Sequence, residues 1–507
     1  MRPVFDETNP KENNWIFKLV NRLHINTKKH VITKDLTFKT GDTVDIHLLE
    51  ESERRLRNQR YFSDANISLV DAPNKAQDSI SKKVQVDVHE VWTLVPKLTY
   101  STAGGATHYG YGLHDSNFLG LGKTIKIEHT STEARTGDII QYRDYNLGDK
   151  NQLILGYADN NDGNESEFSF SKPFSSIRTD WTSGIEYQDF LREDTYYNAG
   201  DEVYRYIHQN AEHSLYYGWK LPNSSDDNVH RLIVGWSHTN DEFSSLPEFN
   251  SDLNVELPYD RNFDSFWIEY SSFKNAYIEM YNIQQINRTE DINLGNQWRL
   301  RIGGVTANTN QMDKSIQVQL NFSKAIKISS TQMLLGELSS SGFYTNGDSI
   351  HTINQMAVSY HWQNFSRGQF YAYANVVDGK NLFDDMPLEL GGDTGLRGYP
   401  VRFQAGNKLE LLTLEQRFFG EKEWFSLFHM GAAVFYDQGR VWGESPVDQT
   451  YNQTLRDVGI GLRISGTRTG GKDDGIHNVA HVDLSYPLDG GTDIDKYQIS
   501  VRIKKSF

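Results

Sequence analysis

The chain has 507 residues, no cysteine and a net charge of −16. Its mean hydropathy is −0.62, and no stretch approaches the roughly 18 consecutive apolar residues of a transmembrane helix, so a helical membrane protein is excluded. Without cysteine there is neither a disulfide framework nor a thiolate metal site, and the acidic balance argues against a nucleic-acid partner.

The first 92 residues differ in pattern from the rest. Residues 1–16 are interpreted as an N-terminal extension that lacks an apolar signal region, so we expect any signal peptide to have been removed or never to have been included in this numbering. Residues 17–92 predict a small α+β domain of order β-α-α-β-β. Its expected elements are a strand at Phe17–Ile25, helices at Thr27–Asp35 and Val44–Arg60, and strands at Ala65–Val70 and Lys83–Val91.

From Thr93 onward, apolar and polar residues alternate with a period of two, between turns rich in Gly, Asn and Asp. Low mean hydropathy is compatible with a membrane barrel, because only alternate residues of its strands face lipid. Aromatic residues make up 12% of the chain, which suits the two interfacial girdles of such a barrel. A soluble β-sandwich is the alternative, but the persistence of alternation favours a transmembrane antiparallel β-barrel over residues 93–507.

The last strand shows the pattern most clearly. Lys505 alone interrupts its apolar face, and a lysine near a strand end can reach the interface. The apolar face consists of Tyr497, Ile499, Val501, Ile503 and Phe507. We therefore expect Tyr497–Phe507 to be the strand that closes the barrel.

Several motifs together resemble the BamA/TamA superfamily of outer-membrane assembly and translocation barrels. The most specific is Gly391–Tyr399, which is similar to the tip of the family's long loop that folds into the lumen. Val434–Trp442 resembles the family's Phe-x-Asp-x-Gly strand, and five alternating segments follow the loop, as the family fold requires. Further matches are Arg55–Ser63, similar to a helix end and strand start of the family's POTRA domain, and Asp115–Gly122, similar to the turn after its second barrel strand.

The resemblance implies one periplasmic POTRA domain at residues 17–92, a barrel of about sixteen strands and a lumen loop at about 380–407. More alternating segments precede the loop than the eleven expected, so some are extracellular hairpins or the barrel is larger. Arg261–Gly295 is the stretch hardest to place.

Within the lumen loop, the resemblance singles out the motif Gly395, Leu396, Arg397, Gly398 and Tyr399. An arginine inside a barrel needs a carboxylate partner, because an unpaired charge in a partly dehydrated lumen is costly. By resemblance, the partners of Arg397 are Asp437 and Glu415. The two glycines would allow a tight turn with positive φ.

The implied function is insertion or translocation of polypeptides, with clients bound by the POTRA domain and a lateral seam between the first and last strands. Pro96 would weaken this seam by withholding a ladder donor, although it is equally explained as an ordinary strand-start residue. A lipid-handling barrel and a passive pore are the alternatives. The seam residues are Pro96, Leu98, Tyr100, Ile499, Val501, Ile503 and Phe507.

The expected location is the Gram-negative outer membrane. Outer-membrane lipids including lipopolysaccharide, and periplasmic polypeptide clients or accessory proteins, are the expected partners. Neither a Gly-x-Ser-x-Gly elbow nor a His-Glu-x-x-His helix is present, so we expect no enzyme, no cofactor and no metal site. Asp159–Glu165 lacks the ligand spacing of a calcium loop and is interpreted as a polar turn.

Overall fold

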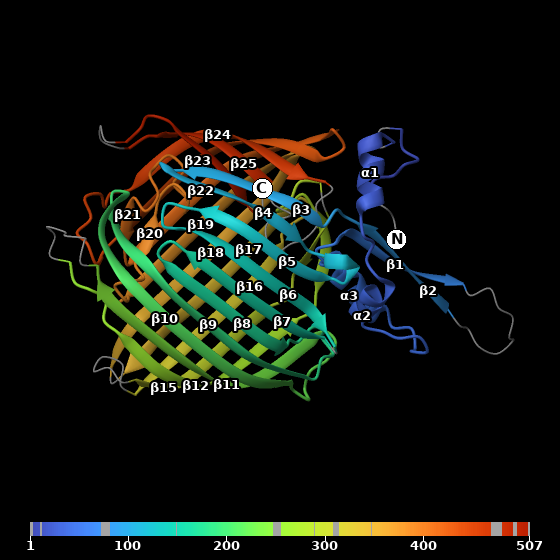
Figure 1. Cartoon of the computed structure of the whole chain (residues 1–507), viewed down its shortest axis with the longest axis horizontal. Helices are drawn as coiled ribbons and strands as arrows, with labels where there is room; N and C mark the ends of the chain where they lie inside the picture. Colours follow the sequence, from blue (N-terminus) through green and yellow to red (C-terminus); the bar gives the residue numbers. More distant parts are fainter. Residues whose placement is uncertain are drawn as a thin grey trace.

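The computed structural model describes residues 4–10, 13–71, 82–148, 150–246, 255–287, 289–307, 314–345, 347–467, 479–489 and 494–504. Within them, twenty antiparallel strands form one closed barrel. Figure 1 shows the N-terminal domain at one end of the barrel and the short strands β20 and β21 at the other. We call these the inner and outer ends.

Fifteen of the described barrel strands precede the long connection after β19, and five follow it. The antiparallel barrel is confirmed. The expected number of about sixteen strands is wrong, and the alternative of a larger barrel is correct. The strands that precede this connection are β3 (Leu94–Ala103), β4 (Ala106–Asp115), β5 (Lys123–Ser131), β6 (Thr136–Leu147), β7 (Asn151–Asn160), β8 (Gly163–Lys172), β9 (Trp181–Asn198), β10 (Asp201–Lys220), β11 (Asn228–Ser245), β12 (Arg261–Lys274), β15 (Gln297–Ala307), β16 (Ser315–Lys327), β17 (Gln332–Thr345), β18 (Asp348–Phe365) and β19 (Gly368–Lys380).

The five later strands are β22 (Lys408–Trp424), β23 (Phe428–Trp442), β24 (Leu455–Gly466), β25 (Val479–Pro487) and β26 (Gln498–Lys504). A 3-10 turn, η1 (Phe118–Gly120), follows β4. Two further two-stranded sheets lie in connections: β13 (Tyr277–Tyr281) with β14 (Thr289–Asn293), and β20 (Leu388–Leu390) with β21 (Gln404–Gly406).

The alternation seen in the sequence separates two faces of the barrel wall. Large apolar side chains point outward on strand after strand, whereas the intervening residues point into the lumen. Outward examples with at least a third of their surface exposed are Tyr111, Ile127, Ile140, Leu155, Ile185, Leu215, Phe266, Ile302, Met356 and Ile460. An apolar exterior of this extent suits hydrocarbon rather than water.

The N-terminal domain has the order α-α-α-β-β: α1 (Trp15–Leu23), α2 (Lys29–Asp35), α3 (Ile46–Arg57), β1 (Phe62–Asp71) and β2 (Lys82–Glu90). The expected strand at Phe17–Ile25 is wrong, because this segment is α1 followed by extended backbone. The Asn14 side chain caps the helix by accepting a hydrogen bond of 2.9 Å from Phe17 N. Ile16, Leu19 and Leu23 also follow the helical spacing i, i+3, i+7.

The core of this domain joins α2 and α3 to the β1–β2 sheet through Val31, Leu56, Phe62 and Val88. The same domain contacts the inner turns of the barrel. The Glu51 carboxylate accepts a hydrogen bond of 3.0 Å from Ile177 N in the β8–β9 turn. These contacts hold the domain against the inner end of the barrel, where β3 begins.

Candidate functional site

The connection between β19 and β22, residues 381–407, folds into the outer half of the lumen. Its strands β20 and β21 pair with one another, and its apolar residues form a core with the barrel wall. Leu390, Leu396 and Tyr399 are fully buried there against Leu411 and Val441. The outer mouth is therefore occupied by the chain's own loop.

Arg397, at the tip of this loop, forms a bidentate ion pair with Asp437 of β23. Its Nε and Nη2 donate hydrogen bonds of 2.7 and 3.0 Å to the two carboxylate oxygens. The guanidinium also lies 3.3 Å from the centre of the Phe435 ring. Burial alone would lower the pKa of Arg397, but the negative charge of Asp437 outweighs it and the net shift is upward.

The two glycines of the motif have different structural roles. Gly395 adopts φ +147°, and a Cβ there would lie 2.5 Å from the Leu411 side chain. Gly398 is not among the residues with positive φ, so that expectation is wrong for it. It is needed for close approach, because a Cβ would lie 2.7 Å from Cβ of Asp457, whose carboxylate accepts a hydrogen bond of 3.0 Å from Gly398 N.

Glu415 lies 3.7 Å from the Arg397 guanidinium, but two other arginines approach it more closely. Arg463 donates to it at 2.7 Å, and Arg417 lies 3.3 Å away. Arg463 also bonds Asp483 at 2.5 Å. Sequence reasoning missed Arg417, Arg463 and Asp483 as members of this lumen network; their inward positions between outward apolar residues were the available signal.

The stretch that sequence reasoning could not place, Arg261–Gly295, contains β12 and then a hairpin, β13–β14, at the inner mouth. The tip of this hairpin crosses to the opposite wall of the lumen. Ile286 is 1% exposed and packs with Phe419, Ala433 and Val479 of β22, β23 and β25. Asn287 Nδ2 donates a hydrogen bond of 3.1 Å to Gly420 O.

Residues 275–296, which we call the inner hairpin, are linked to the outer loop through the barrel wall. Gln369 Nε2 donates to the Asn282 carbonyl at 2.9 Å, and its Oε1 accepts from Arg417 at 3.2 Å. Arg417 contacts Glu415, which in turn faces Arg397. A chain of buried polar contacts therefore runs from the inner hairpin to the loop tip.

The inner hairpin is also joined to the N-terminal domain. Arg57 of α3 forms an ion pair of 2.8 Å with Glu279 and lies 3.7 Å from Asp291. Arg54 stands over the Tyr277 ring at 4.7 Å from its centre. Movement of α3 would therefore act directly on the hairpin.

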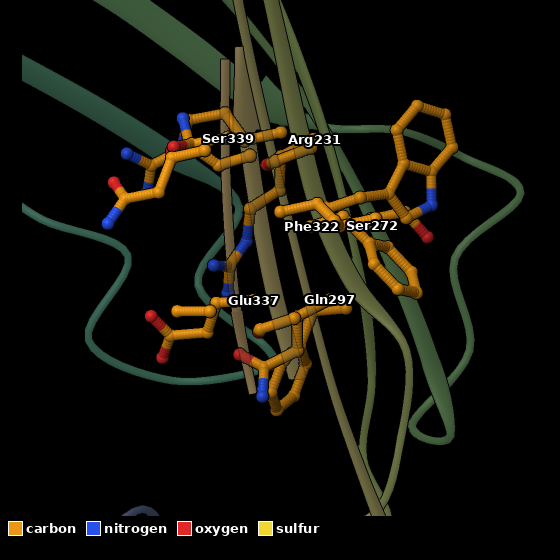
Figure 2. Close-up of a pocket in the computed structure, with 15 residues that line it drawn as sticks. Arg231, Ser272, Gln297, Phe322, Glu337 and Ser339 are labelled. Carbon is orange, nitrogen blue, oxygen red and sulfur yellow. The ribbon is translucent and has the colours of Figure 1, made fainter. Parts of the chain in front are cut away.

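The β11–β18 side of the lumen retains a cavity of about 610 Å³. Figure 2 shows Arg231, Gln297, Glu337 and Ser339 among its lining residues. The outer loop and the charged network lie against β22–β25, on another part of the barrel wall. The cavity is thus bordered by strands other than those that carry the charged network.

The junction between β26 and β3, which closes the barrel, is sparsely paired. Among the described residues, its alignment consists of one pair, Val501 with Thr102. By contrast, seven pairs align β25 with β26, and ten align β3 with β4. Among the described residues, this junction has the fewest aligned pairs of any in the ring.

Six of the seven predicted seam residues fall on these two strands, and three of the six point outward. Tyr100, Ile499 and Ile503 are 56%, 60% and 43% exposed. Pro96 lies on β3 opposite Leu113 of β4. The backbone of Leu98 belongs to β3, and Phe507 lies outside the described residues.

One carboxylate of the loop has a strongly perturbed environment. Burial raises the pKa of Glu389 to about 7, although Arg402 opposes the shift. Arg402 lies 3.3 Å from Glu389 and also pairs with Glu133 of the β5–β6 turn. This cluster ties the base of the loop to the first half of the barrel.

Two searches of the described residues gave negative results. No helix there is long and apolar enough to span a bilayer, and no group of three or more His, Asp or Glu side chains there is arranged to hold a metal ion.

No protein-family model matches the sequence, and no curated protein is similar to it. Among solved structures, the chain is similar to BamA from Haemophilus ducreyi lacking POTRA domains 1–3, with 13% identity and a TM-score of 0.38 over 94% of this chain and 82% of that one. It is also similar to CdiB from Escherichia coli, with 12% identity and a TM-score of 0.47 over 94% of this chain and 74% of that one.

The FrpB iron transporter from Neisseria meningitidis matches as well, with 7% identity and a TM-score of 0.41 over 88% of this chain and 79% of that one. BamA and CdiB are thus structural neighbours of this barrel. At such scores and identities the three matches establish no activity.

Proposed function

We propose that this chain is a gated barrel of the bacterial outer membrane that inserts or translocates polypeptides through a lateral seam, the β26–β3 junction. The single observation that carries the proposal is the sparse pairing of this junction, where Val501 and Thr102 form one aligned pair. A closed sheet with one weak junction separates there at the lowest cost, because fewer backbone hydrogen bonds are lost.

The outward apolar surface supports the membrane location, since an exterior of alternating large apolar residues fits the hydrocarbon region of a bilayer. Periplasmic placement of the N-terminal domain belongs to the same proposal. Its two-stranded β1–β2 sheet offers a strand edge to which an extended client could add a strand.

The presence of chain segments in both mouths argues against a passive pore. The loop at 381–407 occupies the outer half of the lumen, and the inner hairpin reaches across the inner mouth to β22, β23 and β25. A passive pore would show a large, steady conductance in planar bilayers that survives deletion of residues 17–92. We expect small and infrequent openings instead.

A cross-link tests the seam. Thr102→Cys with Val501→Cys joins the aligned pair, whose Cα separation in an antiparallel ladder, about 4.5 to 5.5 Å, suits a disulfide. Val482→Cys with Val501→Cys is the matched control, because it joins β25 to β26 and leaves the seam free. We expect oxidation to abolish client insertion in the first variant only. Full activity in both oxidised variants would refute lateral opening.

A lipid-handling barrel is the second candidate, favoured by one specific feature. An outward apolar groove of about 530 Å³ lies beside the seam, lined in part by Phe418, Val434, Leu484 and Ile499. Its floor includes the small residues Ala432 and Gly461. A deletion strain profiled together for outer-membrane proteins, secreted proteins and lipid asymmetry separates the two functions, since only lipid handling predicts a primary change in lipid asymmetry.

A further inference from the structure

Helix α1 exposes an entire apolar face. Trp15, Ile16, Leu19 and Leu23 are 74%, 50%, 45% and 62% exposed, and no residue of the helix is buried. A nine-residue helix with four such side chains in water is expected to have a partner, because large contiguous apolar patches on soluble surfaces mark binding sites.

The residues of α1 divide into sectors around its axis. At about 100° per residue, the four apolar side chains fall within one sector of about 100°, and Lys18 and Arg22 fall along one edge of it. The opposite sector contacts the protein: the Phe17 ring stacks on Phe5 at 4.0 Å, Asn21 Oδ1 accepts a hydrogen bond of 3.1 Å from Phe5 N, and His24 pairs with Glu90. The apolar sector is therefore the free side of a helix that the domain holds in place.

The helix lies beside the barrel rim. Figure 1 shows α1 at the inner end, near β3, with its axis running across the long direction of the barrel. The chain that follows it meets η1, where Lys28 N donates a hydrogen bond of 2.9 Å to Gly120 O. Leu94, Phe118 and Leu119 are exposed apolar residues of β3 and η1 at the same end. The apolar surface of the barrel thus extends to the segment that follows the C-terminal end of α1.

From these observations we infer that α1 is an interfacial helix that lies in the headgroup region of the inner leaflet and binds anionic phospholipid. The inference goes beyond the proposed function and rests on one part of it, the placement of the barrel in a membrane. A helix parallel to the bilayer surface, with an apolar sector below and basic side chains at its edge, has the form of such anchors. Lys18 and Arg22 would reach anionic headgroups while their methylene stems stay with the apolar sector.

The anchor would determine where the N-terminal domain stands. Because His24 and Thr27 both bind Glu90 at the end of β2, a helix fixed to the membrane also fixes the β1–β2 sheet. One strand of the seam, β3, begins at Leu94, four residues after Glu90. Membrane binding by α1 would therefore hold the client-facing sheet beside the strand that separates.

The absence of cysteine from the native chain permits a single-site test on the full-length protein. Leu19→Cys, at the centre of the apolar sector, is labelled with an environment-sensitive fluorophore and reconstituted in vesicles. The control is Asp42→Cys, an exposed position of the same domain outside α1. The vesicles contain phosphatidylcholine alone or mixed with phosphatidylglycerol, with nitroxide-labelled lipid as quencher.

We expect nitroxide lipid to quench the label at position 19 about twofold or more above the label at position 42, as for a side chain seated at the interface. Quenching should be stronger with phosphatidylglycerol, and Lys18→Glu with Arg22→Glu should remove that increment. Heat-induced unfolding on a gel checks that each variant retains the folded barrel.

Three outcomes would overturn the inference. A label at position 19 that an aqueous quencher reaches as readily as at position 42 would show that the face remains in water. A label shielded from both quenchers would show that protein, such as a second copy, covers it. Lipid quenching independent of phosphatidylglycerol and of the two basic residues would refute the anionic ligand. Because none of these readings needs a client or an open seam, they are independent of failure of the proposed function.

Discussion

Replacing Arg397 with alanine should weaken the docking of the lumen loop. The substitution removes the bidentate partner of Asp437, a carboxylate with 0% exposed side-chain surface. Asp437 then keeps the Thr413 hydroxyl, which donates at 2.8 Å, but loses its closest cation. Breaking a buried pair by removing one partner costs about 3–5 kcal/mol.

That cost is comparable with the free energy that burial of apolar side chains contributes to docking of the loop tip. Full burial of one large apolar side chain contributes about 1.5–3 kcal/mol, and Leu396 and Tyr399 are the two such residues beside Arg397. Loss of the ion pair therefore offsets most of the apolar contribution of the tip. Since each 1.4 kcal/mol is a tenfold change in an equilibrium constant, the undocked fraction should rise by roughly a hundredfold to a few thousandfold.

Docking of the loop can be monitored by the frequency of channel openings in planar bilayers and by the temperature at which the folded barrel is lost on a gel. Arg397→Ala should raise the opening frequency and lower the unfolding temperature. Arg397→Met with Asp437→Asn is the matched control, because it removes both charges and retains much of the volume. If the single variant matches the wild type, or if the double variant is as impaired as the single one, the ion pair does not hold the loop.

Three further predictions concern the mouths and the seam. Ile286→Asp places a carboxylate in a buried apolar contact and should increase open-channel conductance severalfold, whereas Thr289→Asp, exposed on the same hairpin, should not; equal effects would exclude a plug. Because the folded pKa of Glu389, about 7, lies above its ordinary value of 4.5, docking should be fully stabilised below pH 4.5 and lose stability as pH rises through 7. Openings should then be up to about a hundredfold more frequent at pH 8 than at pH 5, since about two pH units separate pH 5 from the folded pKa, and Glu389→Gln should abolish this dependence; a pH response retained in that variant would refute the assignment. Thr102→Cys with Val501→Cys should raise the unfolding temperature on oxidation, and an unchanged temperature would mean that the junction is already fully paired.

The alternation of side chains predicted the barrel because it records a local property of each strand. Val458, Ile460 and Leu462 alternate with Gly459, Gly461 and Arg463 in the sequence, and each of the three apolar residues lies in β24 between two antiparallel neighbours. The number of strands depends on how many hairpins join the ring, and the family resemblance implied too few, about sixteen. The sequence itself indicated a larger barrel, because it contains more alternating segments before the lumen loop than the eleven that the family fold requires. The structure has four more strands than the resemblance implied.

Helix α1 was mistaken for a strand because both readings fit a short segment with apolar residues at mixed spacing. Asn14, a favourable N-cap, was the overlooked signal. The inner hairpin was beyond local patterns for another reason: its tip is stabilised by contacts more than 130 residues distant, such as Asn287 with Gly420. Local sequence patterns do not identify contacts with residues so distant in the chain.

The connection between the two closures bears on how the barrel would open. Gln369 holds a carbonyl of the inner hairpin with its amide nitrogen and Arg417 with its amide oxygen, and Arg417 shares Glu415 with the loop arginine, Arg397. Withdrawal of the hairpin leaves the buried Gln369 amide nitrogen without the Asn282 carbonyl as an acceptor, a cost that reorientation toward the Glu415 carboxylate could relieve. Such a rearrangement would disturb the ion pairs of the loop tip. Arg57 of α3 forms an ion pair with the inner hairpin. A conformational change in the N-terminal domain can therefore be transmitted through the hairpin to the loop at the outer mouth. A gated barrel requires such coupling, whereas a passive pore does not.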